Sequence, residues 1–170
     1  MPSVSAILTA AGESSRMGSP KPLLSWHGIT LVEFQIDCLF KSGVSEVLVV
    51  LGHKASEVIP FIVGTKASYV VNPMYAAGKT TSIKAGLEAI SSKATAVVLL
   101  AVDQPRTPAI VEKVVSTHVK NDAVITSPRY RGHGGHPLIF SSCLFPELEN
   151  ISEKNEGLRE VFQNHLAEIT

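Results

Sequence analysis

Runs of mostly apolar residues alternate along this chain with segments whose apolar residues recur every three or four positions. A short, nearly continuous apolar run is typical of a β-strand that is buried on both faces of a sheet. The predicted strands are Val4–Leu8, Val47–Leu51, Tyr69–Val71, Ala96–Val102, Ala123–Thr126 and Pro137–Phe140.

The segments between these runs predict helices, and several carry recognisable end signals. Thr30 and Glu33 form a capping box that opens a helix running to about Ser42, and Gly43 supplies a left-handed residue after it. Thr107-Pro108 starts another helix as an N-cap followed by proline. The apolar stripe predicted for that helix is Ile110, Val111, Val114 and Val115. The other predicted helices are Ala55–Val63, a helix that starts near Thr80 to Ser82 and carries Ile83, Leu87 and Ile90 on one face, and Gly157–Leu166.

This alternation of strands and helices predicts an α/β fold with right-handed crossovers and a mostly parallel sheet covered on both faces. We therefore expect one domain over residues 1–170 with a three-layer αβα, Rossmann-like architecture. In such sheets ligands bind beyond the carboxyl ends of the strands, so the loops after the strands hold the candidate site residues. These loops are Thr9–Lys21, Gly52-His53, Asn72–Ser82, Asp103–Pro105 and Ser127–His136.

Composition excludes several classes of protein. Hydrophobic residues make up 45% of the 170 residues and charged residues 18%, which argues against disorder. The formal net charge is +0, so nothing favours binding to nucleic acid or to an anionic membrane. No apolar run approaches the ~18 residues of a membrane helix, and no signal peptide is recognisable. Together with two cysteines in apolar surroundings, Cys38 and Cys143, this predicts a cytoplasmic protein with reduced, buried thiols.

The loop after the first strand has an unusual composition. The stretch LTAAGESSRMGSPKPLL, from Leu8 to Leu24, is rich in small residues and contains two cations, Arg16 and Lys21. Small residues let backbone N–H groups approach a ligand closely, and the two cations suit phosphate oxygens. The alternative is an ordinary solvated loop. The dinucleotide fingerprint G-x-G-x-x-G is absent, which disfavours a nicotinamide or flavin enzyme.

A second candidate for phosphate binding is Gly78-Lys79-Thr80, which follows a predicted strand and opens a predicted helix as a P-loop does. The leading glycine of that motif would fall on Pro73, and Met74 and Tyr75 are too bulky to wrap a phosphate closely. A P-loop NTPase that relies on Lys79 therefore stays as an alternative.

Asp103 follows an unbroken apolar run, from Val97 to Val102, and therefore lies at the ligand-binding edge of the sheet. It is either a turn residue or a ligand of Mg²⁺, a cation that prefers one or two carboxylates together with substrate phosphates and waters. His133 and His136 have weak spacing for a metal site, and structural or substrate-lining roles fit them better.

These motifs together resemble the MobA-like nucleotidyltransferases, and among them most closely the molybdenum cofactor cytidylyltransferases. The first loop resembles the family signature L-x-A-G-x-S-x-R-M-G-x-x-K. The segments VVNPMYAAGKTTSIKAGL, LLAVDQP and GGHPLIF resemble later family segments in the same order. The similarity covers nearly the whole chain and implies the nucleotide-diphospho-sugar transferase type of fold.

The resemblance implies roles for particular residues. Catalysis would rest on Arg16, Lys21 and Asp103, with Asp103 holding Mg²⁺. The nucleotide-binding set would be Ala10, Ala11, Gly12, Ser14, Arg16, Lys21, Asn72, Gly78 and Ser82. Ala11 and Ser14 stand where guanylyltransferases usually carry glycine, which favours CTP. The implied reaction moves CMP or another NMP from an NTP to a phosphate-bearing acceptor, a molybdopterin-type cofactor, and releases pyrophosphate. A molybdoenzyme or its chaperone would be the partner.

Two departures from the family pattern bear on the acceptor and on activity. Asn155 stands where relatives usually carry aspartate in a G-D-x-G-A-R segment, and the chain ends at Thr170, before a D-x-D-T-P segment that relatives usually contain. A short relative that binds nucleotide without turnover is therefore a further alternative.

Overall fold

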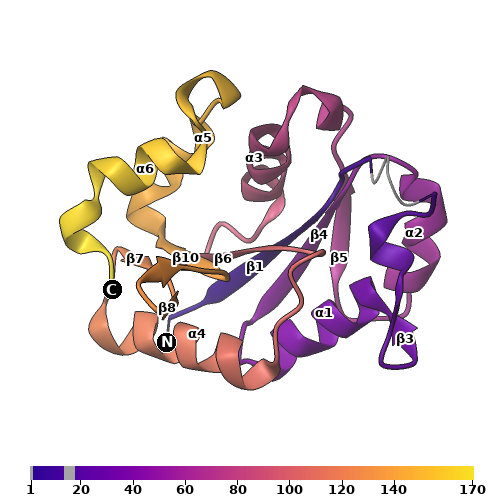
Figure 1. Ribbon diagram of the computed structural model, residues 1–170, viewed down its shortest axis with the longest axis horizontal. Coiled ribbons are helices and arrows are strands. Elements are labelled where there is room, and N and C mark those ends of the chain that lie inside the picture. Colours follow the sequence, from indigo (N-terminus) through magenta and orange to yellow (C-terminus); the bar gives the residue numbers. More distant parts are fainter. Residues whose placement is uncertain (1, 14–17) are drawn as a thin grey trace.

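The computed structural model describes residues 2–13 and 18–170 as a mostly parallel sheet with helices on both faces (Figure 1). The strand order is β5-β4-β1-β6-β10-β7; β5, β4, β1 and β6 pair in parallel, and β10 runs antiparallel to both β6 and β7. The strands are β1 (Val4–Ala10), β4 (Glu46–Leu51), β5 (Ser68–Val71), β6 (Ala96–Ala101), β7 (Ile125–Thr126) and β10 (Leu138–Ser141).

The helices form the two outer layers. They are α1 (Leu31–Lys41), α2 (Ala55–Ile62), α3 (Lys79–Ala89), α4 (Pro108–Asn121), α5 (Phe145–Glu149) and α6 (Leu158–Asn164). The residues of α1, α2 and α4 share one buried cluster with one face of the sheet, and those of α3, α5 and α6 share a second cluster with the other face. Figure 1 shows α1 and α4 on one side of the strands and α3, α5 and α6 on the other. The predicted three-layer α/β architecture is confirmed.

The centre of the sheet is β1, whose alternate side chains supply both cores. Leu8 lies in register with Val49 of β4 and Leu100 of β6 and belongs to the cluster under α1, α2 and α4. Ile7 points the other way, where a Cβ on Gly86 of α3 would come within 2.7 Å of its side chain. Glycine at that position lets α3 lie directly against the sheet.

The helix end signals behave as expected. The capping box is present: Glu33 N donates to Thr30 Oγ1 at 3.4 Å, and Thr30 N donates to Glu33 Oε2 at 3.0 Å. Gly43 has φ +85°, the left-handed conformation predicted for it. Pro108 is the first residue of α4. Local hydrogen bonding and steric restriction decide these ends, so the sequence is sufficient to locate them.

Other predictions need correction. Ile110 does not belong to the buried stripe of α4, since 44% of it is exposed, and Cys143 is exposed rather than buried. The predicted strand Pro137–Phe140 exists as β10 but runs antiparallel. Two hairpins were not predicted, β2 (Ser25–Trp26) with β3 (Ile29–Thr30) and β8 (Arg129–Tyr130) with β9 (His133–Gly134). Their strands are too short to leave a periodic apolar pattern.

The last residues of the chain lie beside β7. Ile169 bridges Ile125 in parallel, Thr170 N donates to Ile125 O at 2.9 Å, and Ser127 N donates to Thr170 O at 3.0 Å. Backbone hydrogen bonds thereby cover part of the edge that β7 would otherwise expose.

Candidate functional site

The strand order places a topological switch point between β1 and β6. From β1 the chain moves to β4 and β5 on one side and then returns to β6 on the other side of β1. Crossovers that leave in opposite directions open a crevice beyond the carboxyl ends of these two strands, which is where open α/β sheets bind ligands. The small-residue loop leaves β1 at this point, and Asp103 follows β6.

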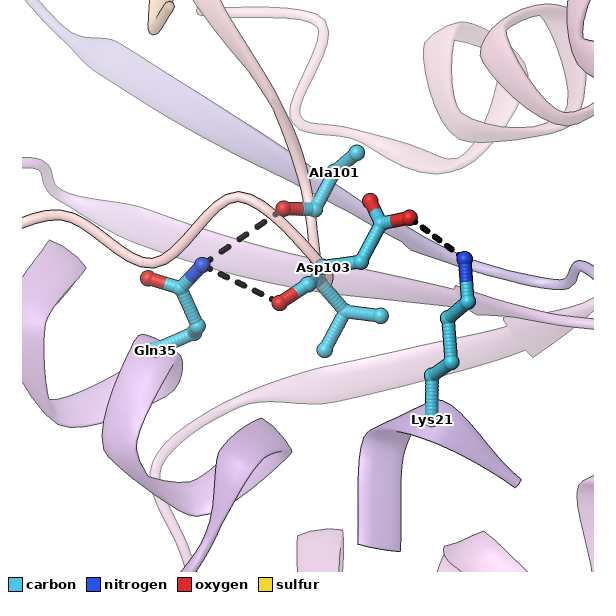
Figure 2. Close-up of polar contacts among 5 residues, drawn as sticks. Lys21, Gln35, Ala101 and Asp103 are labelled. Carbon is cyan, nitrogen blue, oxygen red and sulfur yellow. Dashed lines mark hydrogen bonds and ion pairs between the residues drawn. The ribbon is translucent and has the colours of Figure 1, made fainter. Parts of the chain in front are cut away.

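The two charged residues predicted for catalysis in the described part of the loops meet at this switch point. Lys21, the first residue of the short 3₁₀ helix Lys21–Leu23, places its Nζ 2.8 Å from Oδ2 of Asp103 (Figure 2). Their side chains are 37% and 45% exposed, so a ligand can reach both. An ammonium beside a carboxylate at a switch point can bind a phosphate and its counter-cation together.

Gln35 of α1 supports the strand end that carries Asp103. Its side chain is fully buried, and Nε2 lies 3.5 Å from Ala101 O and 3.4 Å from Val102 O (Figure 2). A buried amide that binds the carbonyls of Ala101, the last residue of β6, and of Val102, the next residue, fixes the direction in which the chain leaves the strand. Sequence reasoning missed this residue, whose one signal is a glutamine within an otherwise apolar helical stripe.

The same face of α1 holds the next part of the loop after β6. Cys38 Sγ donates to Arg106 O at 3.0 Å, and Ser42 Oγ donates to Pro108 O at 3.2 Å. Burial raises the pKa of the Cys38 thiol to about 11, so it stays protonated and can donate. The segment from β6 to α4 is therefore anchored by side chains of α1 and of Ser42, the C-cap residue of that helix.

The start of the first loop is buried and packed against the loop after β4. Ala10 and Ala11 are each 5% exposed, and His53 N donates to Ala11 O at 3.2 Å. A Cβ on Gly52 would lie 2.8 Å from Ala11 O and 2.6 Å from Cβ of Tyr75, so only glycine fits there. Tyr75 was not predicted as a site residue, and this contact brings it beside the predicted nucleotide-binding loop.

Gly12 behaves differently from Gly52. Its φ is not positive, and among the described residues no heavy atom lies within 4 Å of the Cβ that another residue would place there. Within residues 2–13 and 18–170, neither backbone conformation nor packing explains this glycine, and no described atom fills the space beside its backbone. The other two predicted residues of this loop, Ser14 and Arg16, lie outside the described residues.

Asn72 and Ser82 are buried and occupied by internal hydrogen bonds. Asn72 Nδ2 donates to Thr81 Oγ1 at 2.9 Å and to Ser82 Oγ at 3.1 Å, while Asn72 Oδ1 accepts from Met74 N at 2.9 Å. These bonds join the end of β5 to the first turn of α3. The side chains of Asn72 and Ser82 are therefore engaged in hydrogen bonds that fix the two ends of the segment 73–78.

The beginning of α3 is bound by a carboxylate from the other end of the chain. Glu153, in the 3₁₀ helix Glu153–Asn155, accepts a hydrogen bond from Thr80 N at 2.8 Å. Gly78 has φ +121°, a conformation that side chains rarely adopt. A P-loop would offer the amide of Thr80 to a phosphate, so this contact disfavours the P-loop alternative. Glu153 is a second residue that sequence reasoning missed, because no local pattern points to its distant partner.

A cavity of about 360 Å³ lies where β1 and β6 begin, at the other end of these strands from Lys21 and Asp103. None of the predicted site residues lines it. His118 lines it, and its Nδ1 lies 2.8 Å from Thr126 Oγ1. Burial lowers the pKa of His118, so the ring is neutral at pH 7. We assign this histidine to the packing of α4 on β7.

Asp103 fits a metal that is shared with a substrate better than a metal held by protein alone. Within residues 2–13 and 18–170, no three His, Cys, Asp or Glu side chains gather closely enough to hold a cation. Mg²⁺ commonly uses one or two carboxylates and completes its shell with phosphates and water.

No helix in the described part of the chain is long and apolar enough to cross a membrane.

The structure is an open, mostly parallel α/β sheet with Lys21 and Asp103 together at its switch point. The pattern of the MobA-like NTP transferase domain matches residues 6–169, and the chain belongs to this family. The predicted family resemblance is thereby confirmed.

The named relatives differ in activity. The chain is 31% identical over 163 residues to the molybdenum cofactor cytidylyltransferase of Escherichia coli K12, covering 93% of this chain and 82% of that protein. It is 32% identical over 167 residues to the nicotine blue oxidoreductase of Paenarthrobacter nicotinovorans, covering 94% and 81%.

The solved structures agree in fold. The structure of Rv0371c from Mycobacterium tuberculosis H37Rv has a TM-score of 0.82 at 28% identity, covering 95% of this chain and 82% of that one. A manganese complex of the same protein has a TM-score of 0.74 at 26% identity, covering 96% of this chain and 83% of that one. A nucleotidyl transferase from Methanothermobacter thermautotroptrophicus shows the same fold, with a TM-score of 0.82 at 24% identity, covering 98% and 85%.

Proposed function

We propose that this MobA-like NTP transferase moves CMP from CTP to the phosphate of a molybdopterin-type cofactor and releases pyrophosphate. The observation that carries the proposal is the 2.8 Å contact between Lys21 Nζ and Asp103 Oδ2 at the switch point. The similarity to a cytidylyltransferase supports the choice of nucleotide and acceptor. Ala11 and Ser14 support CTP over GTP, and the product would pass to a molybdoenzyme or its chaperone.

In the proposed reaction an acceptor phosphate oxygen attacks the α-phosphorus of CTP. A new P–O bond forms while the bond to the β-phosphate breaks, and pyrophosphate leaves with the electron pair. The nucleophile is already an anion, so no side chain has to remove a proton. The protein's contribution is to position the two substrates and to neutralise their charge.

Each described residue then has a role that follows from its place. Lys21 exchanges its contact with Asp103 for the β- and γ-phosphates and stabilises the leaving pyrophosphate. Asp103, released from Lys21, would hold Mg²⁺ against the triphosphate. Bound there, the cation would supply Lewis-acid polarisation of the reacting phosphate. The open space beside Gly12 would admit the nucleotide close to the backbone.

An oxidoreductase function has support only in the name of one relative, the nicotine blue oxidoreductase, and the chain lacks the dinucleotide fingerprint. The transferase proposal predicts a release of pyrophosphate that hydride transfer would not produce.

The test is incubation with CTP or GTP, Mg²⁺ and molybdenum cofactor, with pyrophosphate and the dinucleotide product as readouts. We expect turnover with CTP and slower turnover with GTP. Lys21→Ala should lower turnover about 100-fold or more, whereas Lys79→Ala at saturating acceptor should not. A loss confined to Lys79→Ala would favour the P-loop alternative, and nucleotide binding without product would favour a non-catalytic relative.

A further inference from the structure

The segment between α5 and α6 contacts the first turn of α3 at two points. Glu153 Oε1 accepts a hydrogen bond from Thr80 N at 2.8 Å. A Cβ on Gly157 would lie 3.2 Å from Cγ2 of the same threonine, so the backbone at Gly157 approaches it closely. Thr80 is buried. Residues about 75 positions apart in the sequence therefore meet at the start of α3.

Glu153 is presented by a closed turn of the chain. Ser152 Oγ accepts from Asn155 N at 3.3 Å, and Ser152 O accepts from Gly157 N at 2.9 Å. These bonds fix the backbone on both sides of Glu153. A carboxylate on a backbone that is already ordered loses less conformational freedom when it binds the amide of Thr80.

The side chain of Glu153 also packs against the residue before α3. A Cβ on Gly78 would overlap Cγ and Oε1 of Glu153. Gly78 N donates to Tyr75 O at 3.3 Å, and Thr81 Oγ1 donates to Gly78 O at 2.8 Å. Glu153 thus contacts the end of a turn that begins with the 3₁₀ helix Tyr75–Ala77 and closes on α3.

Tyr75 connects this turn to the start of the first loop. A Cβ on Gly52 would lie 2.6 Å from Tyr75 Cβ and 2.8 Å from Ala11 O, so the tyrosine and the loop pack on opposite sides of one glycine. His53, whose N donates to Ala11 O at 3.2 Å, has its ring centroid 6.1 Å from that of Tyr75. Groups packed this closely do not move independently, so a shift of the turn would displace the loop.

We propose that Glu153 is a positioning residue of the nucleotide site: it fixes the turn 75–78 so that Tyr75 holds the loop at Ala10–Gly12 in the conformation that binds CTP. This inference rests on the proposed function. Glu153 itself touches no substrate in this proposal. Its effect has a distinctive sign, because a carboxylate that acted only through its charge would repel the triphosphate, and its removal would tighten CTP binding. Loss of positioning weakens CTP binding instead.

The experiment compares Glu153→Ala, Glu153→Gln and the matched control Glu149→Ala. Glu149, the last residue of α5, is exposed and makes no side-chain hydrogen bond or ion pair within the described ranges. With Mg²⁺ and molybdenum cofactor, we expect the KM for CTP to rise about tenfold in Glu153→Ala, since a charge-assisted hydrogen bond is lost. In Glu153→Gln it should rise no more than about threefold, because the amide oxygen still accepts from Thr80 N. The control should match the wild type.

A double-mutant cycle tests the route through Tyr75. Tyr75→Ala removes the contact with Gly52, so adding Glu153→Ala to it should change the KM for CTP by less than about twofold. Additive effects of the two substitutions would overturn the proposed route. All assays run well below the lowest Tm of the set, because partial unfolding lowers kcat and leaves KM unchanged.

The outcomes separate this inference from the proposed function. Tighter CTP binding in Glu153→Ala, a loss in kcat alone, or a glutamine variant as weak as the alanine variant overturns the inference. If the wild type releases no pyrophosphate, the proposed function fails, and calorimetric titration with CTP and Mg²⁺ decides the inference alone. Weaker binding by Glu153→Ala than by Glu153→Gln and Glu149→Ala supports it. Equal binding by all variants, or no binding by the wild type, overturns it.

Discussion

Replacing Asp103 by asparagine separates a metal ligand from a structural ion pair. The variant keeps the shape of the side chain but removes the charge that a hard cation needs. Because both members of the Lys21–Asp103 pair are more than a third exposed, the pair should contribute only about 0.2–1 kcal/mol to stability. In a chain of 170 residues that corresponds to a fall in Tm of at most about 4 °C. Mg²⁺-dependent pyrophosphate release should fall about 100-fold or more.

The chain offers a matched control in a second exposed lysine–aspartate pair. Lys41 Nζ lies 2.6 Å from Asp37 Oδ2 on α1, with side chains 63% and 55% exposed. Asp37→Asn makes the same chemical change away from the crevice and should alter Tm by a similarly small amount while activity stays unchanged. Thermal unfolding and Mg²⁺ titrations of activity are measured for the wild type and both variants. The reasoning is refuted if Asp103→Asn retains the wild-type dependence on Mg²⁺, or if it loses activity only in proportion to a large loss of stability.

Three further predictions follow from individual residues. Gly12→Ala should fold with an unchanged Tm, because a Cβ there meets no described atom, yet bind CTP more weakly in calorimetry; equal affinity would mean that no ligand approaches this backbone. In the native protein Cys143 should react with a thiol reagent at pH 8 well before Cys38, whose buried thiol has a pKa raised to about 11, and simultaneous labelling would contradict the structure. Since burial lowers the pKa of His118, the unfolded chain takes up a proton below about pH 6.5 that the folded chain resists, and this contribution to stability is lost as the pH falls. The stability advantage of the wild type over His118→Gln in chemical denaturation should therefore shrink between pH 7.5 and pH 5, and a constant difference would exclude this titration.

Much of the site could be predicted from local sequence because its chemistry lies at the ends of strongly patterned elements. The apolar run before Asp103 and the small-residue loop before Lys21 mark two strand ends, and parallel strands present their carboxyl ends at one edge. The capping box of α1 and the proline at the start of α4 were likewise local signals. Roles that rest on family motifs, such as those of Ser14 and Arg16, stay predictions.

The contacts that position these groups could not be predicted in the same way. Gln35 binds the end of β6 from α1, and Glu153 binds the start of α3 from the far end of the sequence. The predicted nucleotide ligand Asn72 lies buried in an internal network. Each of these depends on which elements become neighbours after folding, and no periodicity within a window of a few residues encodes that.

The sequence by itself determined the alternation of buried strands and amphipathic helices, because hydrophobic periodicity and helix caps act over short distances. From that alternation follow the layered α/β architecture and the position of Lys21 and Asp103 after two strand ends. Only the tertiary structure decided that β1 and β6 flank the switch point, that β10 runs antiparallel, and that Lys21 and Asp103 lie 2.8 Å apart. Strand order is chosen by the packing of whole layers, and the side chains that meet at the crevice follow from that order rather than from their own neighbours in the chain.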